Sequence, residues 1–295
     1  MKPFLKNISS VDLINFIFLT FISVIYFISF NQTPYKTVMF IALILLYTLI
    51  FFAGKARFSD NRFKRVMLFV YPVIFLFLIF ETFFMILPYF NANRYDLLMS
   101  EIDFSMFGVN PTVWLESFTF PALTEILYLC YFIYFPMPFI ILIWLYKKNM
   151  LVELESTIFA FFVCYYGAYV MYFFIPVMGP RFFLADIQTI ELNGLLFSSA
   201  IKNLILALEP NKLDAFPSLH AAIVMVTMLA ANKYNKKIFN ILLPLAIAII
   251  FSLTYLRYHY VIDIIAGLAW AVFSWFLAKK IFNYIGQTLS PHFGK

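Results

Sequence analysis

Charged residues are scarce in this chain of 295 residues: Asp, Glu, Lys and Arg make up 12% of it, against 64% hydrophobic residues. Soluble domains carry about 25% charged residues. A chain with so little charge cannot cover a water-facing surface of its own size, and its mean hydropathy of +0.90 agrees with that deficit. The composition therefore excludes an ordinary water-soluble protein and predicts side chains in contact with lipid.

Cysteine and histidine are also rare. Two cysteines, Cys130 and Cys164, each stand inside an apolar run, where we expect buried free thiols rather than a disulfide. Of three histidines, His292 lies in a polar C-terminal stretch and is expected to be solvated and inert. No spacing typical of metal ligands joins the other two, so we expect neither a metal nor another cofactor.

Long apolar runs are what the chain has in quantity. They are continuous rather than alternating, which favours membrane-spanning helices over barrel strands. The first run lacks a small-residue cleavage site and is long enough to span, so we interpret it as a helix and not a cleavable signal. We predict an all-α, polytopic membrane bundle of about eight transmembrane helices. Each run meets or approaches the roughly 17–25 residues that a span needs: 13–31, 37–54, 66–88, 124–146, 156–176, 216–232, 238–256 and 259–282.

The connecting loops indicate the orientation of these spans. Eight spans place both termini on one side of the membrane, and that side holds most of the 21 Lys and Arg residues. Cytoplasmic loops collect Lys and Arg, so we expect both termini in the cytoplasm. The basic residues then report topology, and nucleic acid is not an expected partner.

Two segments on the opposite, outer side are longer than turns. Segment 89–123 has the pattern of short amphipathic helices at the interface, with Trp114 as an aromatic anchor. Segment 177–215 is a long loop of the kind that often carries function. Two acidic residues near this face, Asp103 and Glu125, are expected to cap helices or to pair with a nearby arginine.

His220 follows a strong helix-start signal. Pro217 and Ser218 stand just before it, and Ser218 is a suitable N-cap. The free N–H groups and the positive dipole end of a helix start attract an anion, and His220 adds a proton donor there. The alternative interpretation is a capped helix start with an interfacial histidine.

His259 and Asp263 are four residues apart and share one helix face. An ionised aspartate in an apolar helix is costly unless it has a partner. A carboxylate beside an imidazole fixes its tautomer and raises its basicity, as catalytic triads do. The alternative is a structural pair that only satisfies a polar group.

Two arginines lie near the same outer face. Arg181 follows the fifth apolar run, and Arg257 stands two residues before His259. Guanidinium groups bind phosphate oxygens in bidentate fashion. Each arginine alone would be read as an anchor for lipid headgroups, but two arginines, two histidines and a helix start together indicate a phosphate pocket.

These residues resemble the signature motifs of the type 2 phosphatidic acid phosphatase superfamily. Pro217-Ser218-Leu219-His220 is similar to its second motif, Pro-Ser-Gly-His. Ser252, His259 and Asp263 stand at the spacing of its third motif. That motif has Arg after its Ser, whereas this chain has Leu253, and we expect Arg257 to supply the missing charge.

At the first motif the chain differs more strongly from the superfamily pattern. The superfamily has Lys, six residues, then Arg-Pro, whereas here Phe174 stands in place of Lys and Pro180 precedes Arg181. These departures are similar to the inositol phosphorylceramide synthase-related branch. The resemblance implies a six-helix catalytic core within a domain at 66–295, preceded by two accessory transmembrane helices in 1–65.

The resemblance also implies a mechanism. His259 would attack phosphorus and form a phosphohistidine, Asp263 would orient it, and His220 would protonate the leaving oxygen. The phosphate would be held by residues Arg181, Arg257 and Ser218, without a metal.

Three functions stay open at this point. The first is a membrane lipid phosphatase acting on a lipid phosphate or pyrophosphate. The second is a phosphotransferase that moves a phosphorylated headgroup onto a lipid alcohol, and the third is a non-catalytic protein that binds or transports lipids. We expect a multi-pass protein of the plasma (inner) membrane, surrounded by membrane lipids, with its site on the non-cytoplasmic face.

Overall fold

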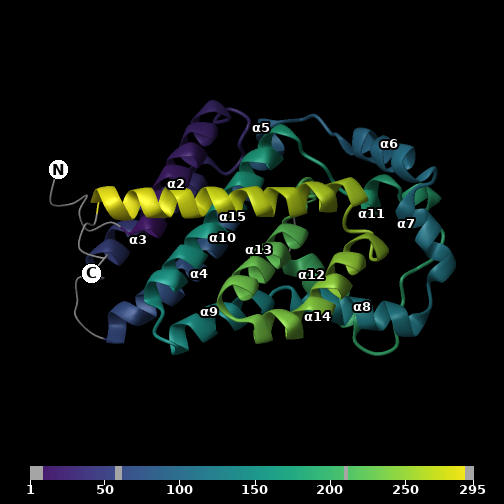
Figure 1. The fold of residues 1–295 in the computed structure, drawn as a ribbon. Coiled ribbons are helices and arrows are strands. Elements are labelled where there is room, and N and C mark those ends of the chain that lie inside the picture. Colours follow the sequence, from purple (N-terminus) through teal and green to yellow (C-terminus); the bar gives the residue numbers. More distant parts are fainter. Residues whose placement is uncertain (1–8, 57–61, 209–211, 290–295) are drawn as a thin grey trace. The chain divides into compact units, whose positions relative to one another are not determined.

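A computed structural model describes residues 9–56, 62–208 and 212–289. Regular structure in these ranges is helical (Figure 1), apart from one isolated bridge between Val177 and Asp214. The helices are α2 (Ser10–Ile28), α3 (Lys36–Ala56), α4 (Arg62–Phe84), α5 (Leu87–Phe90), α6 (Asp96–Phe107), α7 (Pro111–Trp114), η1 (Leu115–Phe118), α8 (Pro121–Ile133), α9 (Met137–Lys147), α10 (Leu151–Phe174), α11 (Pro180–Phe183), η2 (Ala185–Ile187), α12 (Ser198–Leu208), α13 (Leu219–Tyr234), α14 (Lys236–Tyr255) and α15 (Val261–Leu289).

The predicted fold class, an all-α polytopic membrane bundle, is confirmed. Within the described ranges seven helical segments are long and apolar enough to cross a membrane, which identifies an integral membrane protein. One of them joins α8 and α9 as a single segment, Pro121–Lys147. The expected run at 216–232 is also helical, but α13 has only 16 residues and is buried along most of its length. The seven segments are Ser10–Ile28, Lys36–Ala53, Val70–Phe90, Pro121–Lys147, Leu151–Phe174, Lys236–Tyr255 and Val261–Ile285.

The chain forms two compact units. One contains Met1–Ala92, Asn149–Tyr166 and Ser274–Lys295, and the other contains Asn93–Lys148 and Gly167–Phe273. The predicted division into accessory helices at 1–65 and a catalytic domain at 66–295 is a functional one, and it stays a prediction.

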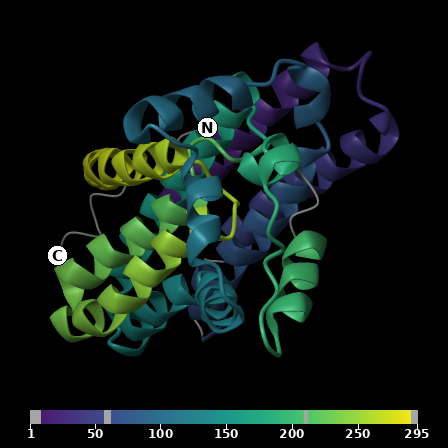
Figure 2. The same ribbon diagram turned by 90° about the vertical axis from the view of Figure 1, so that its right-hand side faces the viewer.

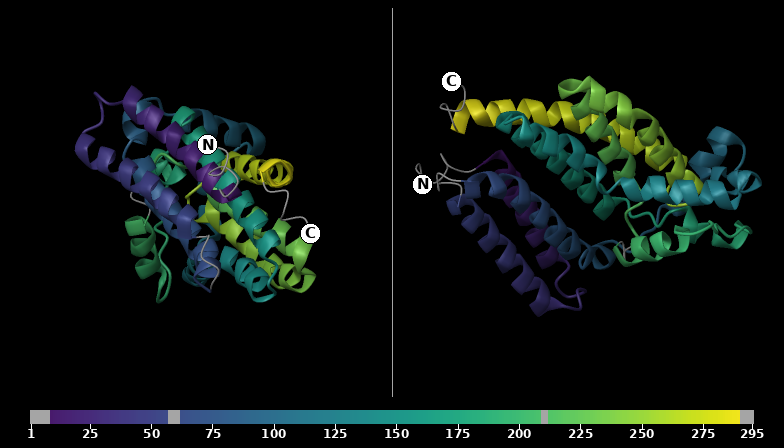
Figure 3. Two further views of the ribbon diagram at one scale, coloured as in Figure 1. Left: turned by 90° about the vertical axis from the view of Figure 1, so that its left-hand side faces the viewer. Right: turned by 90° about the horizontal axis from the view of Figure 1, so that it is seen from below.

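In the first unit, α2 packs beside α3 and α3 packs beside α4 (Figure 3). Helix α2 starts with a capping box, in which Ser9 accepts from the Asp12 amide and the Asp12 carboxylate accepts from the Ser9 amide. Buried Asn15 in the middle of α2 would be costly without partners. Its amide group donates to the Tyr71 hydroxyl and accepts from the Tyr166 hydroxyl, so the two hydroxyls satisfy it.

In the second unit, α14 packs against both α8 and α13 (Figure 2). Tyr131, Ala221 and Leu253, from three different helices, are all fully buried in the core that these helices share. The short helices expected in segment 89–123 are present as α6, α7 and η1.

The first turns of α13 and α15 are joined closely. The Ser218 amide donates to the Asp263 carbonyl, with 2.9 Å between nitrogen and oxygen. Gly267 makes this approach possible, because a Cβ atom at that position would lie 2.2 Å from the Ser218 carbonyl oxygen. The contact brings together the two chain segments that carry the histidines.

Candidate active site

Ser218 caps α13 as the sequence predicts. Its side chain accepts from the Ala221 amide at 3.3 Å, and Ser218 is fully buried. Because its own amide donates to Asp263, both polar groups of Ser218 already have partners within the fold. Ser218 therefore positions the helix that carries His220, and its predicted role in binding phosphate stays a prediction.

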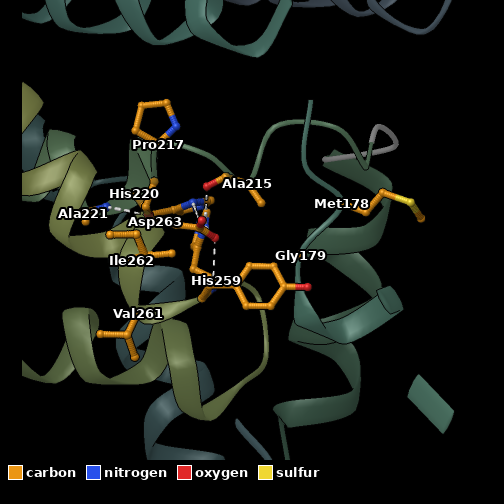
Figure 4. A network of polar contacts seen from close by, with 12 residues as sticks. Met178, Gly179, Ala215, Pro217, His220, Ala221, His259, Val261, Ile262 and Asp263 are labelled. Atoms are coloured by element: carbon orange, nitrogen blue, oxygen red, sulfur yellow. Dashed lines mark hydrogen bonds and ion pairs between the residues drawn. The ribbon is translucent and has the colours of Figure 1, made fainter. Parts of the chain in front are cut away.

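His220 and His259 are in direct contact (Figure 4). Nδ1 of His220 lies 3.1 Å from Nε2 of His259, and Nδ1 of His259 lies 3.0 Å from the Ala215 carbonyl oxygen. A carbonyl can only accept, so Nδ1 of neutral His259 carries the proton and Nε2 carries the lone pair. Nδ1 of His220 is then the donor in the bond between the two rings.

Tyr131 continues this chain of hydrogen bonds on the other side of His220. Its hydroxyl lies 2.7 Å from Nε2 of His220, and the side chain is fully buried in α8. The Tyr131 ring stacks on Tyr258, and the Tyr134 ring also packs against His220. Sequence reasoning missed Tyr131, and its only signal is that Tyr128, Tyr131 and Tyr134 recur at a three-residue spacing.

Asp263 lies near His259, as predicted. Its Oδ2 is 3.6 Å from Nδ1 of His259 and accepts from the Tyr260 amide at 2.9 Å. The Ala215 carbonyl is closer to Nδ1 than the carboxylate is. The structure thus places both a carbonyl and a carboxylate beside the ring nitrogen that must keep its proton.

The environment of His259 favours its neutral form. The side chain is almost fully buried, and burial together with the nearby His220 lowers the pKa of His259 well below its ordinary value of 6.5. The Ala215 carbonyl opposes this shift only in part. A neutral imidazole with a lone pair on Nε2 is the form that a nucleophile requires.

Arg181 lies in α11, directly after a sharp turn at Gly179. Gly179 has φ +90°, and a Cβ atom there would lie 2.7 Å from the Tyr258 carbonyl oxygen. The Arg181 amide donates to the Arg257 carbonyl, and its guanidinium lies 5.3 Å from the Tyr258 ring centre. In the described part of the chain the Arg181 guanidinium has neither a hydrogen bond nor an ion pair.

Two neighbouring cavities share Arg181. The first cavity, of about 110 Å³, lies at the histidine pair. The second cavity, of about 250 Å³, contains neither histidine in its lining. The lining of the first includes Arg181, Phe182, Lys212, Asp214, His220 and His259, and that of the second includes Tyr128, Arg181, Gln188, Glu191, Lys202 and Arg257.

Arg257 lines the second cavity and not the first. Its backbone has φ +66°, and its guanidinium donates to Glu116 at 2.7 Å and to the Ile190 carbonyl at 2.6 Å. Burial lowers the pKa of Arg257, and Glu116 opposes that shift. Arg181 therefore shares a cavity with the histidines, whereas Arg257 lines only the second cavity.

Two carboxylates of α6 hold the backbone of the site. Asp96 accepts from the Met178 and Gly179 amides, and Asp103 accepts from the Val261 and Ile262 amides. Burial raises the pKa of both carboxyls, and these amides oppose the shift.

Glu125 has a similar role at another helix. It accepts from four successive amides, 195–198, at the start of α12. The helix-capping role expected of Asp103 and Glu125 is thus confirmed, although each caps a helix far away in the sequence.

Comparison with known proteins gives one match. The family model described as the PAP2 superfamily matches residues 99–277, which is more than half of the chain and includes both histidines. No curated protein and no solved structure matches the chain.

Proposed function

Because the chain belongs to the PAP2 superfamily, we propose that it is a membrane lipid phosphatase whose nucleophile is His259. A phosphatase or phosphotransferase type of activity follows from the family. The observation that carries the finer proposal is the directed hydrogen bonding of His259, whose Nδ1 faces a carbonyl and whose Nε2 faces His220 in the first cavity.

The first step begins when a phosphoryl group enters between the two rings. Nε2 of His259 forms a bond to phosphorus while the bond from phosphorus to the leaving oxygen breaks. His220, in its protonated form, passes its Nδ1 proton to the leaving oxygen and keeps the Nε2 proton directed at Tyr131. The products are a phosphohistidine and a lipid alcohol. When the substrate is a lipid pyrophosphate, the lipid product is a monophosphate instead of an alcohol.

The second step restores the enzyme. His220 is now neutral and takes a proton at Nδ1 from water, whose oxygen attacks phosphorus as the bond to His259 breaks. A lipid hydroxyl in place of water gives the phosphotransferase alternative with the same residues.

Charges around the first cavity support binding of the reacting phosphate. Arg181 and Lys212 both line it, and preorganised cations stabilise charge that develops on phosphoryl oxygens. Asp263 stabilises the charge that develops on the His259 ring. The first cavity therefore has a nucleophile, an acid and two cations beside one carboxylate, Asp214, within one small volume.

The sidedness follows from the distribution of basic residues. The termini lie in the cytoplasm and the site faces the non-cytoplasmic side of the plasma (inner) membrane.

Phosphate release from purified protein in detergent tests the proposal. Phosphatidic acid, phosphatidylglycerol phosphate and a polyprenyl pyrophosphate are offered, each with and without diacylglycerol or ceramide. We expect free phosphate without an acceptor, and product formed only with the acceptor would favour the transferase. His259→Ala should abolish turnover, with His292→Ala as the matched control, and retained turnover in His259→Ala would exclude His259 as the nucleophile.

A further inference from the structure

The second cavity is a polar site enclosed by several segments of the fold, and the reaction proposed above does not use it. Its volume of about 250 Å³ far exceeds the roughly 10–15 Å³ that a single water needs. Its walls come from α8, the segment 185–192, α12 and the turn before α15. Arg181 separates it from the first cavity and lines both.

Several hydrogen-bond donors at this cavity have no partner among the described residues. The Arg257 side chain is only 11% exposed, yet its Nε has no hydrogen-bond partner in the described part of the chain. Buried donors in proteins are normally paired. In the same described ranges the Arg181 guanidinium and the Lys202 ammonium also have neither a hydrogen bond nor an ion pair.

The carboxylates nearby are already engaged. Glu116 accepts from Arg257 and also from the hydroxyl of Thr189. Glu191 accepts from the side-chain amide of Asn193. Because a hydrogen bond from a neutral amide leaves the charge of Glu191 in place, three cations at this site stand against two carboxylates, Glu116 and Glu191. The excess of positive charge favours an oxygen-rich anion.

We infer that the second cavity binds a second phosphate-type oxyanion, held by Arg181, Arg257 and Lys202. The first cavity holds the reacting phosphoryl group, and this assignment of the first cavity rests on the proposed function. Two sources have the required chemistry: a second phosphate on the same lipid substrate, and free inorganic phosphate after hydrolysis. Arg181 lines both cavities, so its guanidinium is shared between the two anions.

Binding of inorganic phosphate tests the second site without turnover. In full-length His259→Ala protein in detergent, we expect calorimetry to resolve two phosphate sites. Adding Lys202→Gln should weaken one of them at least tenfold, whereas Lys202→Arg should keep both. Lys233→Gln, at the far end of α13, is the matched control. One site only in the His259→Ala protein, or two unchanged sites with Lys202→Gln, would overturn the inference.

Kinetics then identify the source of the anion. We compare the KM of a lipid pyrophosphate with that of the monophosphate of the same lipid in active protein. If the second phosphate belongs to the substrate, Lys202→Gln raises the ratio of these KM values about tenfold. If the source is free phosphate, the ratio stays constant and inhibition by inorganic phosphate weakens instead. A variant that changes neither the ratio nor the inhibition contradicts the inference.

The two proposals fail separately. Wild-type protein that releases phosphate from neither lipid contradicts the proposed function. The number of phosphate-binding sites that calorimetry resolves in His259→Ala protein still decides whether the second cavity binds an oxyanion.

Discussion

Tyr131, His220, His259 and the Ala215 carbonyl form one directed chain of hydrogen bonds. The tyrosine hydroxyl donates to Nε2 of neutral His220, Nδ1 of His220 donates to Nε2 of His259, and Nδ1 of His259 donates to the carbonyl. Each ring nitrogen in the chain thus has a hydrogen-bond partner. When His220 is protonated, the tyrosine oxygen accepts instead, so Tyr131 holds the ring in both states.

We expect Tyr131→Phe to slow turnover of alkyl phosphates about tenfold to a hundredfold, because general acid catalysis contributes about 10²–10⁴-fold and a misoriented His220 loses part of it. An aryl phosphate with an acidic phenol needs no proton on its leaving group, so its turnover should change little. Steady-state rates on both substrates provide the measurement, with Tyr146→Phe as the control. An equal loss on both substrates would show that Tyr131 serves packing alone.

Stability should depend on pH through His259. Its pKa in the folded protein lies well below the ordinary 6.5, so the unfolded chain binds a proton that the native protein does not. The stabilising contribution is complete above pH 6.5 and is lost as pH falls through the folded pKa, by at most about 1.4 kcal/mol per pH unit. Thermal unfolding between pH 4.5 and 7.5 should show a smaller pH dependence in His259→Gln than in wild type.

Two buried carboxyls change the stability with pH in the direction opposite to His259. The raised pKa values of Asp96 and Asp103 mean that their contribution falls as pH rises from 3.8 to the folded pKa. Because His259→Gln leaves these carboxyls in place, the difference from wild type isolates the histidine. Identical pH dependence in the two proteins would contradict a depressed pKa at His259.

Sequence reasoning selected His220, His259, Asp263 and Arg181 because polar residues at the ends of apolar runs are conspicuous, and their roles in the reaction stay predictions. It could not show the separation of Arg257 from the first cavity, which Arg181 lines together with the second. That separation depends on the left-handed backbone at Arg257 and on its pairing with Glu116, 141 residues away. Neither feature leaves a local pattern in the sequence.

At the level of elements, α6 holds two parts of the site at once. Asp96 and Asp103 are seven residues apart and so lie on the same side of the helix. One accepts from amides before α11 and the other from amides at the start of α15. The sequence predicts short interfacial helices and capping carboxylates here, but not their distant partners.

Asp103→Ala should destabilise the protein by about 1.5–3 kcal/mol, because hydrogen bonds to a charged group have roughly that net value. Turnover should fall as well, since α15 carries Asp263. Asp103→Asn keeps one acceptor oxygen, so its melting temperature should lie between those of the wild type and Asp103→Ala. Melting temperatures in detergent check this, with Glu101→Ala on the exposed side of α6 as control. Equal melting temperatures for Asp103→Ala and Glu101→Ala would argue against the role of α6.

At the level of the whole molecule, the sidedness of the membrane can be tested at the segment Pro121–Lys147. Exposed Ser117 and Lys148 stand before and after it. In protein whose Cys130 and Cys164 are replaced by Ala, we expect Ser117→Cys to react with an impermeant maleimide in intact cells. Lys148→Cys should react only after permeabilisation, and the reverse pattern would invert the proposed topology.

Hydropathy alone predicts α13 as a span, since it cannot distinguish a helix that faces lipid from one that faces protein. Ala221, Ala222, Ala230 and Ala231 are fully buried, and these small side chains let neighbouring helices approach closely. The buried alanines explain why α13 packs against protein along most of its 16 residues, and a helix enclosed in this way can still cross the membrane.

The contact between Gly267 and Ser218 has a consequence for helix register. A shift of α15 by one residue, about 1.5 Å along its axis with a rotation of about 100°, would bring Ala266 or Leu268 against the Ser218 carbonyl, where even a Cβ atom has no room. Helix α15 therefore has a single axial setting. In that setting the Asp263 carbonyl receives the Ser218 amide while its carboxylate lies beside His259.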